Sequence, residues 1–338
     1  MRLITPITIS LILSLFILLT VGIRKDQICI SDKSQFSYES QRKTEKNGVI
    51  SIKFSVNPNN DDAREFLVED VATSFSIEPT RCSMYIRRAF NRPGYVNDIL
   101  RHRDEIWRYS YDGKGKKLLT LALTDDNSKY AGYFSGSFSI DWSEEYIVLE
   151  KTYTNPDDNK LVFKELKNLE KDVFTLSHEK LIEGDPQEIY GDIGFLKWSI
   201  DEKYFWGRLS DAAQTIAFFR IDTQNWIYGV FKPPPNTMGG NDLNPDLGYI
   251  TYNPASYWSG DADFTAWERE ERKKQGKSSD LRIYNLFIKE DRLIESTKDD
   301  PIWFYKPEWI SENELEYELP SGQKKIYNLD TGEYKLIP

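Results

Sequence analysis

Hydrophobic and polar residues alternate along most of this chain in short runs, and turn-forming residues separate one run from the next. The run Val49–Val56 (Val-Ile-Ser-Ile-Lys-Phe-Ser-Val) alternates at period two and predicts a β-strand with one buried face. Turn sequences such as Asp112-Gly113 and Ser321-Gly322 bound runs of this kind. After this strand, only Asp263–Lys274 has the pattern of a helix, inside an insertion at about 253–280. The pattern therefore predicts an all-β protein with one helical excursion.

One strand-and-turn phrase recurs about every 54 residues, and such a period indicates a stack or ring of small sheets. Its copies lie at residues 105–113, 161–168, 217–223, 282–289 and 325–332. Aligned on the residue at the turn, the copies bring five positions into register: Asp112, Asn168, Asp222, Phe287 and Asp330.

A second phrase precedes the later copies of the first and consists of an apolar anchor, a polar turn and an alternating strand. It occurs at residues 141–149, 197–206, 242–252 and 308–317. Together the two phrases predict a four-stranded antiparallel unit, which is stable only when neighbouring units cover its faces. Trp142, Trp198 and Trp309 occupy the anchor, so we expect them in the core between units.

The paired phrases resemble the repeat of TolB-like and WD40-like β-propellers, in which an apolar-Ser-Pro-Asp-Gly-Lys turn leads into a strand and a later strand ends in Asp-x-x-Thr-Gly. Tyr327–Glu333 resembles that ending, while Ser199–Glu202 and Asn244–Leu247 each keep half of the turn. The resemblance covers roughly residues 70–338 and implies a β-propeller of five or six four-stranded blades within 49–338. A sixth blade would lie in residues 30–70, or the strand at 49–56 would complete the last blade.

The N-terminus has a different pattern. No charged residue occurs from Leu3 to Ile23, and this run would span about 32 Å as a helix, close to the ~30 Å hydrocarbon layer of a bilayer. It predicts one transmembrane helix within residues 1–25, followed by a polar juxtamembrane linker at 26–48. A retained signal-anchor with the C-terminal domain on the extracytoplasmic side of the cell membrane is favoured, and cleavage of a signal peptide with secretion is the alternative.

Composition narrows the chemistry. The net charge of −10 and the absence of a basic stripe disfavour nucleic acid as a partner. The two cysteines, Cys29 and Cys82, are either free thiols, which is the simpler interpretation, or a disulfide in an exported domain. His102 and His178 have no metal-ligand spacing, and no Gly-x-Ser-x-Gly nucleophile is present. No catalytic residue, cofactor or metal ligand is therefore singled out.

The sequence favours a non-enzymatic protein-binding or scaffolding module of the cell envelope that engages a protein or a surface polymer. The candidate partner surface is Trp258, Asp261, Asp263 and Trp267, because aromatic residues beside acidic ones on an excursion are typical of interaction surfaces. Alternatively, these aromatic residues fold back over the edge of the sheets. The rival function is a propeller glycoside hydrolase or carbohydrate-binding protein that uses acidic and aromatic residues at a central channel.

Overall fold

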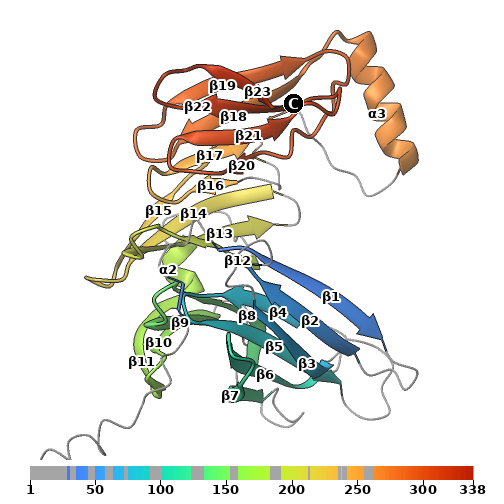
Figure 1. Cartoon of the computed structure of the whole chain (residues 1–338). Helices are drawn as coiled ribbons and strands as arrows, with labels where there is room; N and C mark the ends of the chain where they lie inside the picture. The colour runs from blue at the N-terminus through green and yellow to red at the C-terminus, as the bar shows by residue number, and fades with distance from the viewer. Residues whose placement is uncertain are drawn as a thin grey trace, which may run out of the picture. The chain divides into compact units, whose positions relative to one another are not determined.

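The computed structural model describes residues 29–30, 36–44, 50–57, 64–71, 75–91, 101–122, 133–152, 159–182, 192–211, 214–234, 237, 242–254 and 262–337. Within these ranges the chain is almost entirely antiparallel β-sheet (Figure 1), as predicted. The predicted membrane segment 3–23, Trp258 and Asp261 lie outside them. In the part of the chain that the structure describes, no helix is long and apolar enough to cross a membrane.

The chain divides into two compact units, of which the first comprises Met1–Leu123 with Trp142–Glu144. This unit contains a three-stranded and a four-stranded sheet, and in both the strands pair in sequence order. The strands are β1 (Tyr38–Thr44), β2 (Ile50–Val56), β3 (Arg64–Val71), β4 (Phe75–Pro79), β5 (Ser83–Asn91), β6 (Arg101–Ser110) and β7 (Gly115–Ala122). Because β2 pairs with β1 and β3, it belongs to a separate sheet rather than completing the last one.

The core of the first unit follows from the alternation in β2. Ile52 and Phe54 are fully buried and pack in one cluster with Met84 and Ile86 of β5. Strand β1 lies within 26–48, the segment predicted as a linker, so the ordered sheet begins before residue 49. Its residues 38–43 are all exposed, and an exposed edge strand carries no hydrophobic alternation by which a sequence could reveal it.

The second unit, Thr124–Asp141 with Glu145–Pro338, contains four four-stranded sheets and two helices among its described residues. The first two sheets consist of β8 (Tyr133–Ile140), β9 (Tyr146–Thr152), β10 (Lys160–Glu165), β11 (Asn168–Ser177), and of β12 (Asp192–Trp198), β13 (Tyr204–Asp211), β14 (Gln214–Asp222), β15 (Ile227–Phe231). The other two consist of β16 (Leu243–Asn244), β17 (Tyr249–Tyr252), β18 (Ser279–Asn285), β19 (Asp291–Thr297), and of β20 (Glu308–Trp309), β21 (Glu314–Glu318), β22 (Lys324–Asn328), β23 (Tyr334–Ile337). The helices are α2 (His178–Ile182) and α3 (Ala262–Lys274).

The repeat predicted from the sequence is present in the structure. The five copies of the first phrase fall on or beside the third strand of each four-stranded sheet, namely β6, β10, β14, β18 and β22. The second phrase forms the turn from the first to the second strand. The helix predicted over 263–274 is present as α3, whereas α2 was not predicted.

Apolar clusters join each sheet of the second unit to the next. Trp198 lies in the cluster that joins β8–β11 to β12–β15, and Trp309 in the cluster that joins β16–β19 to β20–β23. Both indole rings are buried, so their predicted place between sheets is confirmed. Trp142 of the first unit is only partly buried and packs edge-on against Phe36, with ring centroids 5.4 Å apart.

Four turns of the second unit share one hydrogen-bond pattern. In each, an Asp or Asn side-chain oxygen accepts the backbone N–H groups two and three residues later. The backbone oxygen of the same residue accepts the N–H four residues later, and that fourth residue has a positive φ. The acceptor residues are Asp222, Asn244, Asn285 and Asn328. Asn285 and Asn328 therefore occupy, in their own copies of the repeat, the position that Asp222 occupies in its copy. The sequence alignment, which placed Phe287 and Asp330 at this position, was two residues out of register there.

One carboxylate, that of Asp242, contacts three successive sheets. Its Oδ1 lies 2.6 Å from Nζ of Lys197 on β12 and accepts the N–H of Leu243, the first residue of β16, at 3.0 Å. Its Oδ2 accepts the backbone N–H of Trp309 on β20 at 2.7 Å. The first strands of these three sheets are thus tied together by charge-assisted hydrogen bonds.

Cys29 and Cys82 form a disulfide, so the simpler interpretation of two free thiols is wrong. The backbone around the bridge is also paired: Ile30 N–H donates to the Arg81 oxygen at 2.8 Å, and Arg81 N–H donates to the Trp142 oxygen at 2.9 Å. Segments distant in sequence therefore meet at the β4–β5 turn. The pairing was not evident from the sequence because Cys29 belongs to no strand or repeat.

Candidate protein-binding sites

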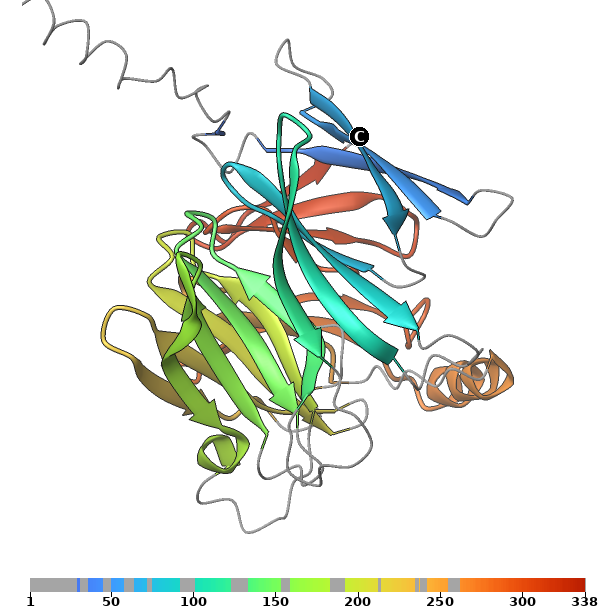
Figure 2. The ribbon, with the colours of Figure 1, turned by 90° about the horizontal axis from the view of Figure 1, so that it is seen from below.

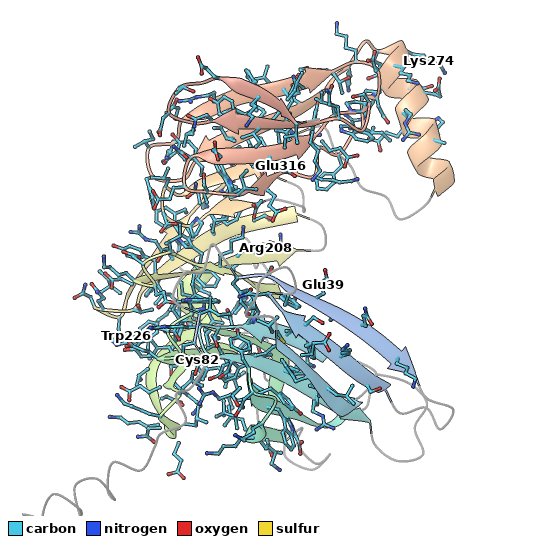
Figure 3. All side chains as sticks on the ribbon, viewed as in Figure 1. Glu39, Cys82, Arg208, Trp226, Lys274 and Glu316 are labelled. Atoms are coloured by element: carbon cyan, nitrogen blue, oxygen red, sulfur yellow. A yellow bond between two sulfur atoms is a disulfide. The ribbon has the colours of Figure 1, made fainter. Side chains whose placement is uncertain are left out.

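The insertion that carries the predicted partner surface lies between β17 and β18. Figures 1 and 2 show its helix α3 outside the stacked sheets of its unit. Ion pairs along the helix stabilise it. Arg272 lies 2.8 Å from Glu268, and Lys274, which is labelled in Figure 3, lies 2.7 Å from Glu271. Arg269 Nε lies 3.0 Å from Oδ1 of Asp300 and ties α3 to the segment after β19.

The structure places two of the four predicted surface residues on this helix. Trp267 is 60% exposed. Asp263 lies in the first turn of α3, and its side chain is not among those described, while Trp258 and Asp261 lie outside the described residues. The surface formed by all four residues stays a prediction, and Trp267 is the member with a defined position.

A second candidate site surrounds Arg220, a residue that the sequence did not single out. Its guanidinium carbon Cζ lies 4.4 Å from the ring centroid of Tyr204 and 4.8 Å from that of Phe287. The centroids of Trp206 and Phe231 are 5.7 and 6.0 Å away. All four distances are within the range of cation–π attraction. We call these five residues the Arg220 aromatic cage.

Strand geometry explains why the cage forms. Tyr204 and Trp206 lie two residues apart on β13 and share one face of the sheet. Arg220 of β14 lies directly opposite Trp206, and its partner on β15 is Gly229, which has no side chain to occupy the space beside it. Phe231 follows two residues later, on the same face as Gly229.

The fourth ring comes from the neighbouring sheet. Phe287 lies in the β18–β19 turn, and its centroid is 5.3 Å from Phe231 and 5.8 Å from Trp206. Gly248 beside it has a φ of +69°, and a Cβ at this position would lie 2.5 Å from the Phe287 ring. Glycine at this position therefore allows the close approach of the Phe287 ring, and it adopts the positive φ of the turn without strain.

No ion pair among the described residues balances the charge of Arg220. Among the described residues no hydrogen bond or ion pair to its guanidinium is present, although Arg220 contributes, after a hydrogen bond from Asn225, to the lowered pKa of Asp222. The Arg220 side chain is neither fully buried nor fully exposed. This is a half-buried cation with apolar rings against it and free donors.

The described residues contain no group of three or more His, Cys, Asp or Glu side chains that would hold a metal ion. His178 is buried at the start of α2, and His102 lies on β6.

Comparison with known proteins gives a fold and no family. No family model and no curated protein matches the sequence. Prolyl oligopeptidase B from Galerina marginata, bound to a 35mer hydrolysis and macrocyclization substrate, is similar in structure with a TM-score of 0.51 and 10% identity, over 94% of this chain and 43% of that protein. TolB from Acinetobacter baumannii matches with a TM-score of 0.40 and 11% identity, over 84% of this chain and 58% of that one. The Dos1 propeller matches with a TM-score of 0.46 and 9% identity, over 89% of this chain and 73% of that one.

Within the residues that the structure describes, the chain is an all-β protein made mainly of four-stranded antiparallel sheets, and TolB and a propeller protein, whose repeats its sequence resembles, are among the proteins that are similar to it in structure. It spans about half the length of prolyl oligopeptidase B and of TolB. At these identities the likeness concerns the fold alone.

Proposed function

We propose that this chain is a non-enzymatic protein-binding or scaffolding module, a propeller of five or six blades held at the cell envelope by residues 3–23. The observation that carries the binding role is Trp267. Three tryptophans of the sheets, Trp198, Trp206 and Trp309, are buried, whereas Trp267 is 60% exposed on a helix outside the sheets. Tryptophan is enriched among the residues that dominate protein interfaces, because its large ring loses much water-exposed area on binding.

The surroundings of Trp267 support a presented surface. The neighbouring charged residues of α3 pair with one another or, through Arg269, with Asp300. The ion pairs stabilise the helix and attach it to the segment after β19, so that α3 does not depend on a large apolar face. A partner would therefore contact a pre-formed helix that carries an aromatic anchor, and pre-organisation lowers the entropic cost of binding.

Site-specific cross-linking tests this role. A photo-activated cross-linking residue replaces Trp267 in the full chain expressed in its own cells, and in a control strain it replaces Ile227, which is 63% exposed on edge strand β15. We expect a discrete cross-linked protein product from position 267 and none from position 227. A pull-down with the wild-type chain should recover the same partner protein, and a pull-down with Trp267→Ala should not. The melting temperature of Trp267→Ala should equal that of the wild type. A large fall in melting temperature, or identical products from both positions, would show that Trp267 is a structural residue.

The disulfide supports an extracytoplasmic position for the sheets, because disulfides persist in oxidising compartments. Protease added to intact cells should remove the domain and leave the N-terminal segment protected. Survival of the intact domain, or soluble protein that begins near Ile23, would contradict a tethered and exported protein. A propeller glycoside hydrolase or carbohydrate-binding protein, with acidic and aromatic residues at a central channel, is the alternative.

A further inference from the structure

The guanidinium of the Arg220 aromatic cage has no hydrogen-bond acceptor among the described residues, whereas a partly buried structural arginine normally has one. Elsewhere in the same unit the half-buried Arg282 makes a two-pronged contact with Asp291, with Nε–Oδ1 and Nη2–Oδ2 distances of 3.0 Å. In the cage, by contrast, no hydrogen bond or ion pair to the guanidinium is present among the described residues, and the Asp222 carboxylate, two residues on along β14, interacts with it only electrostatically. Rings attract the positive charge but accept no conventional hydrogen bond, so the five N–H donors of the side chain stay available.

We propose that the Arg220 aromatic cage is a binding site for a carboxylate group. The rings of Tyr204 and Phe287 lie closest to the guanidinium and limit its movement, which presents its N–H fork in one orientation. A planar, fixed fork matches the two oxygens of a carboxylate, and the charge-assisted pair is strong where the surroundings are apolar. A bound carboxylate also offsets the cost of holding an unpaired cation among aromatic rings.

A carboxylate fits this site better than a phosphate group. One guanidinium supplies one fork and one positive charge, and among the described residues no second cation contacts the same four rings. The chain as a whole carries a net charge of −10, which repels a doubly charged anion more than a singly charged one. The aromatic walls accommodate the methylene stem of a glutamate or of another carboxylate with an apolar body.

The carboxylate comes either from an acidic side chain of a peptide segment or from a small free acid, and the experiment separates these sources. The full chain in detergent is titrated with an acetylated, amidated Gly-Glu-Gly peptide, with its Gly-Gln-Gly counterpart and with sodium acetate. The fluorescence of the protein is recorded at constant ionic strength. We expect saturable binding of the Glu peptide with a Kd on the order of 1 mM and no binding of the Gln peptide. Acetate that binds as well as the Glu peptide would assign the site to small acids, and much weaker acetate binding would assign it to peptide segments.

Two variants and a control decide the role of Arg220. Arg220→Met keeps an apolar stem of similar length in the cage and should abolish binding, and Arg220→Lys keeps the charge but not the fork and should weaken it about tenfold. Arg208→Lys is the matched control, because Arg208 (labelled in Figure 3) lies on β13, two residues after Trp206. It should bind the Glu peptide as the wild type does. Absence of saturable binding to the wild type, binding that survives Arg220→Met, or equal loss in Arg208→Lys would overturn the proposal. If Arg220→Met fails to fold, the comparison between the two lysine variants decides.

Discussion

The disulfide between Cys29 and Cys82 allows a prediction whose size follows from the structure. Its cysteines are 53 residues apart in sequence, and the loop that they close contains β1 to β4. The chain-entropy relation for a loop of that length gives about 4 kcal/mol at 25 °C, because the bridge removes extended conformations from the unfolded state. We therefore expect the double variant Cys29→Ala, Cys82→Ala to lose about 4 kcal/mol of unfolding free energy in the first unit.

The loss should be confined to that unit. The hydrogen bonds of Ile30 and Arg81 beside the bridge involve backbone atoms, which the substitutions leave in place. Thr80 also anchors this corner, since its Oγ1 donates to Glu144 Oε1 at 2.6 Å and Arg108 contacts the other oxygen of the same carboxylate. The variant should thus keep the native fold and differ mainly in the entropy of its unfolded state.

Hydrogen exchange with mass-spectrometric detection separates the two units. Amides of β2 and β5 should exchange about a thousandfold faster in the double variant, the equivalent of ~4 kcal/mol, whereas amides of β18 and β22 should change little. Wild-type protein treated with a reducing agent should match the variant. A change below about 1 kcal/mol in β2 and β5, or an equal change in both units, would refute the reasoning that loop closure stabilises the first unit.

Two further predictions concern the second unit. Gly207→Ala should destabilise it by about 1–3 kcal/mol in thermal unfolding, because the new Cβ would lie 2.1 Å from the buried Phe219 ring. Gly229→Ala, where the nearest ring atom is 3.2 Å away, should cost less, and equal losses would show that packing around Phe219 is not the cause. Burial, with a further contribution from Asp291, raises the pKa of Tyr252 from 10.0 to about 12. Because the folded-state pKa is the higher one, this stabilisation is complete below pH 10 and is lost as the pH rises from 10 towards 12. Urea unfolding over that pH range should show a shallower decline for Tyr252→Phe than for the wild type, and identical declines would contradict the assignment.

Much of the fold could be predicted because buried strands leave a mark in the sequence. The alternation of Ile52, Phe54 and Val56 predicted β2, and the recurring anchors predicted the core positions of Trp198 and Trp309. Strand β1 left no such mark, since all its described side chains are exposed.

The alignment of the repeats failed for a related reason. The turns are specified by one hydrogen-bond acceptor and by one position with a positive φ, and neither requires a particular residue. That fourth position is Trp226, Gly248, Lys289 or Gly332 in the four turns. The sequence alignment therefore matched Asp222 with Asp330 because both are aspartates, although Asn328 is the acceptor in the last turn.

The two candidate sites differ in how far the sequence can reveal them. Trp267 belongs to one short insertion, and the local sequence was sufficient to predict its helix, while it left open whether the aromatic residues are exposed or fold back over the sheets. The Arg220 aromatic cage combines three strands and a turn of the next sheet, so cross-strand register and sheet packing have to be known before its members meet. A signal was present in hindsight: Tyr204 and Trp206 alternate with Phe205, which predicts that both faces of β13 are aromatic.

Asp242 changes how the second unit should lose its structure. In a stack of repeats each member normally contacts only its immediate neighbours, so that an end member can detach without affecting those beyond the next. The carboxylate of Asp242 bonds to Lys197 and to the backbone of Trp309, which belong to sheets on either side of its own. Separation of the last sheet would thus leave this carboxylate with one bond fewer and weaken its hold on the sheet two places away. The last three sheets are coupled beyond nearest neighbours and should melt as one cooperative block.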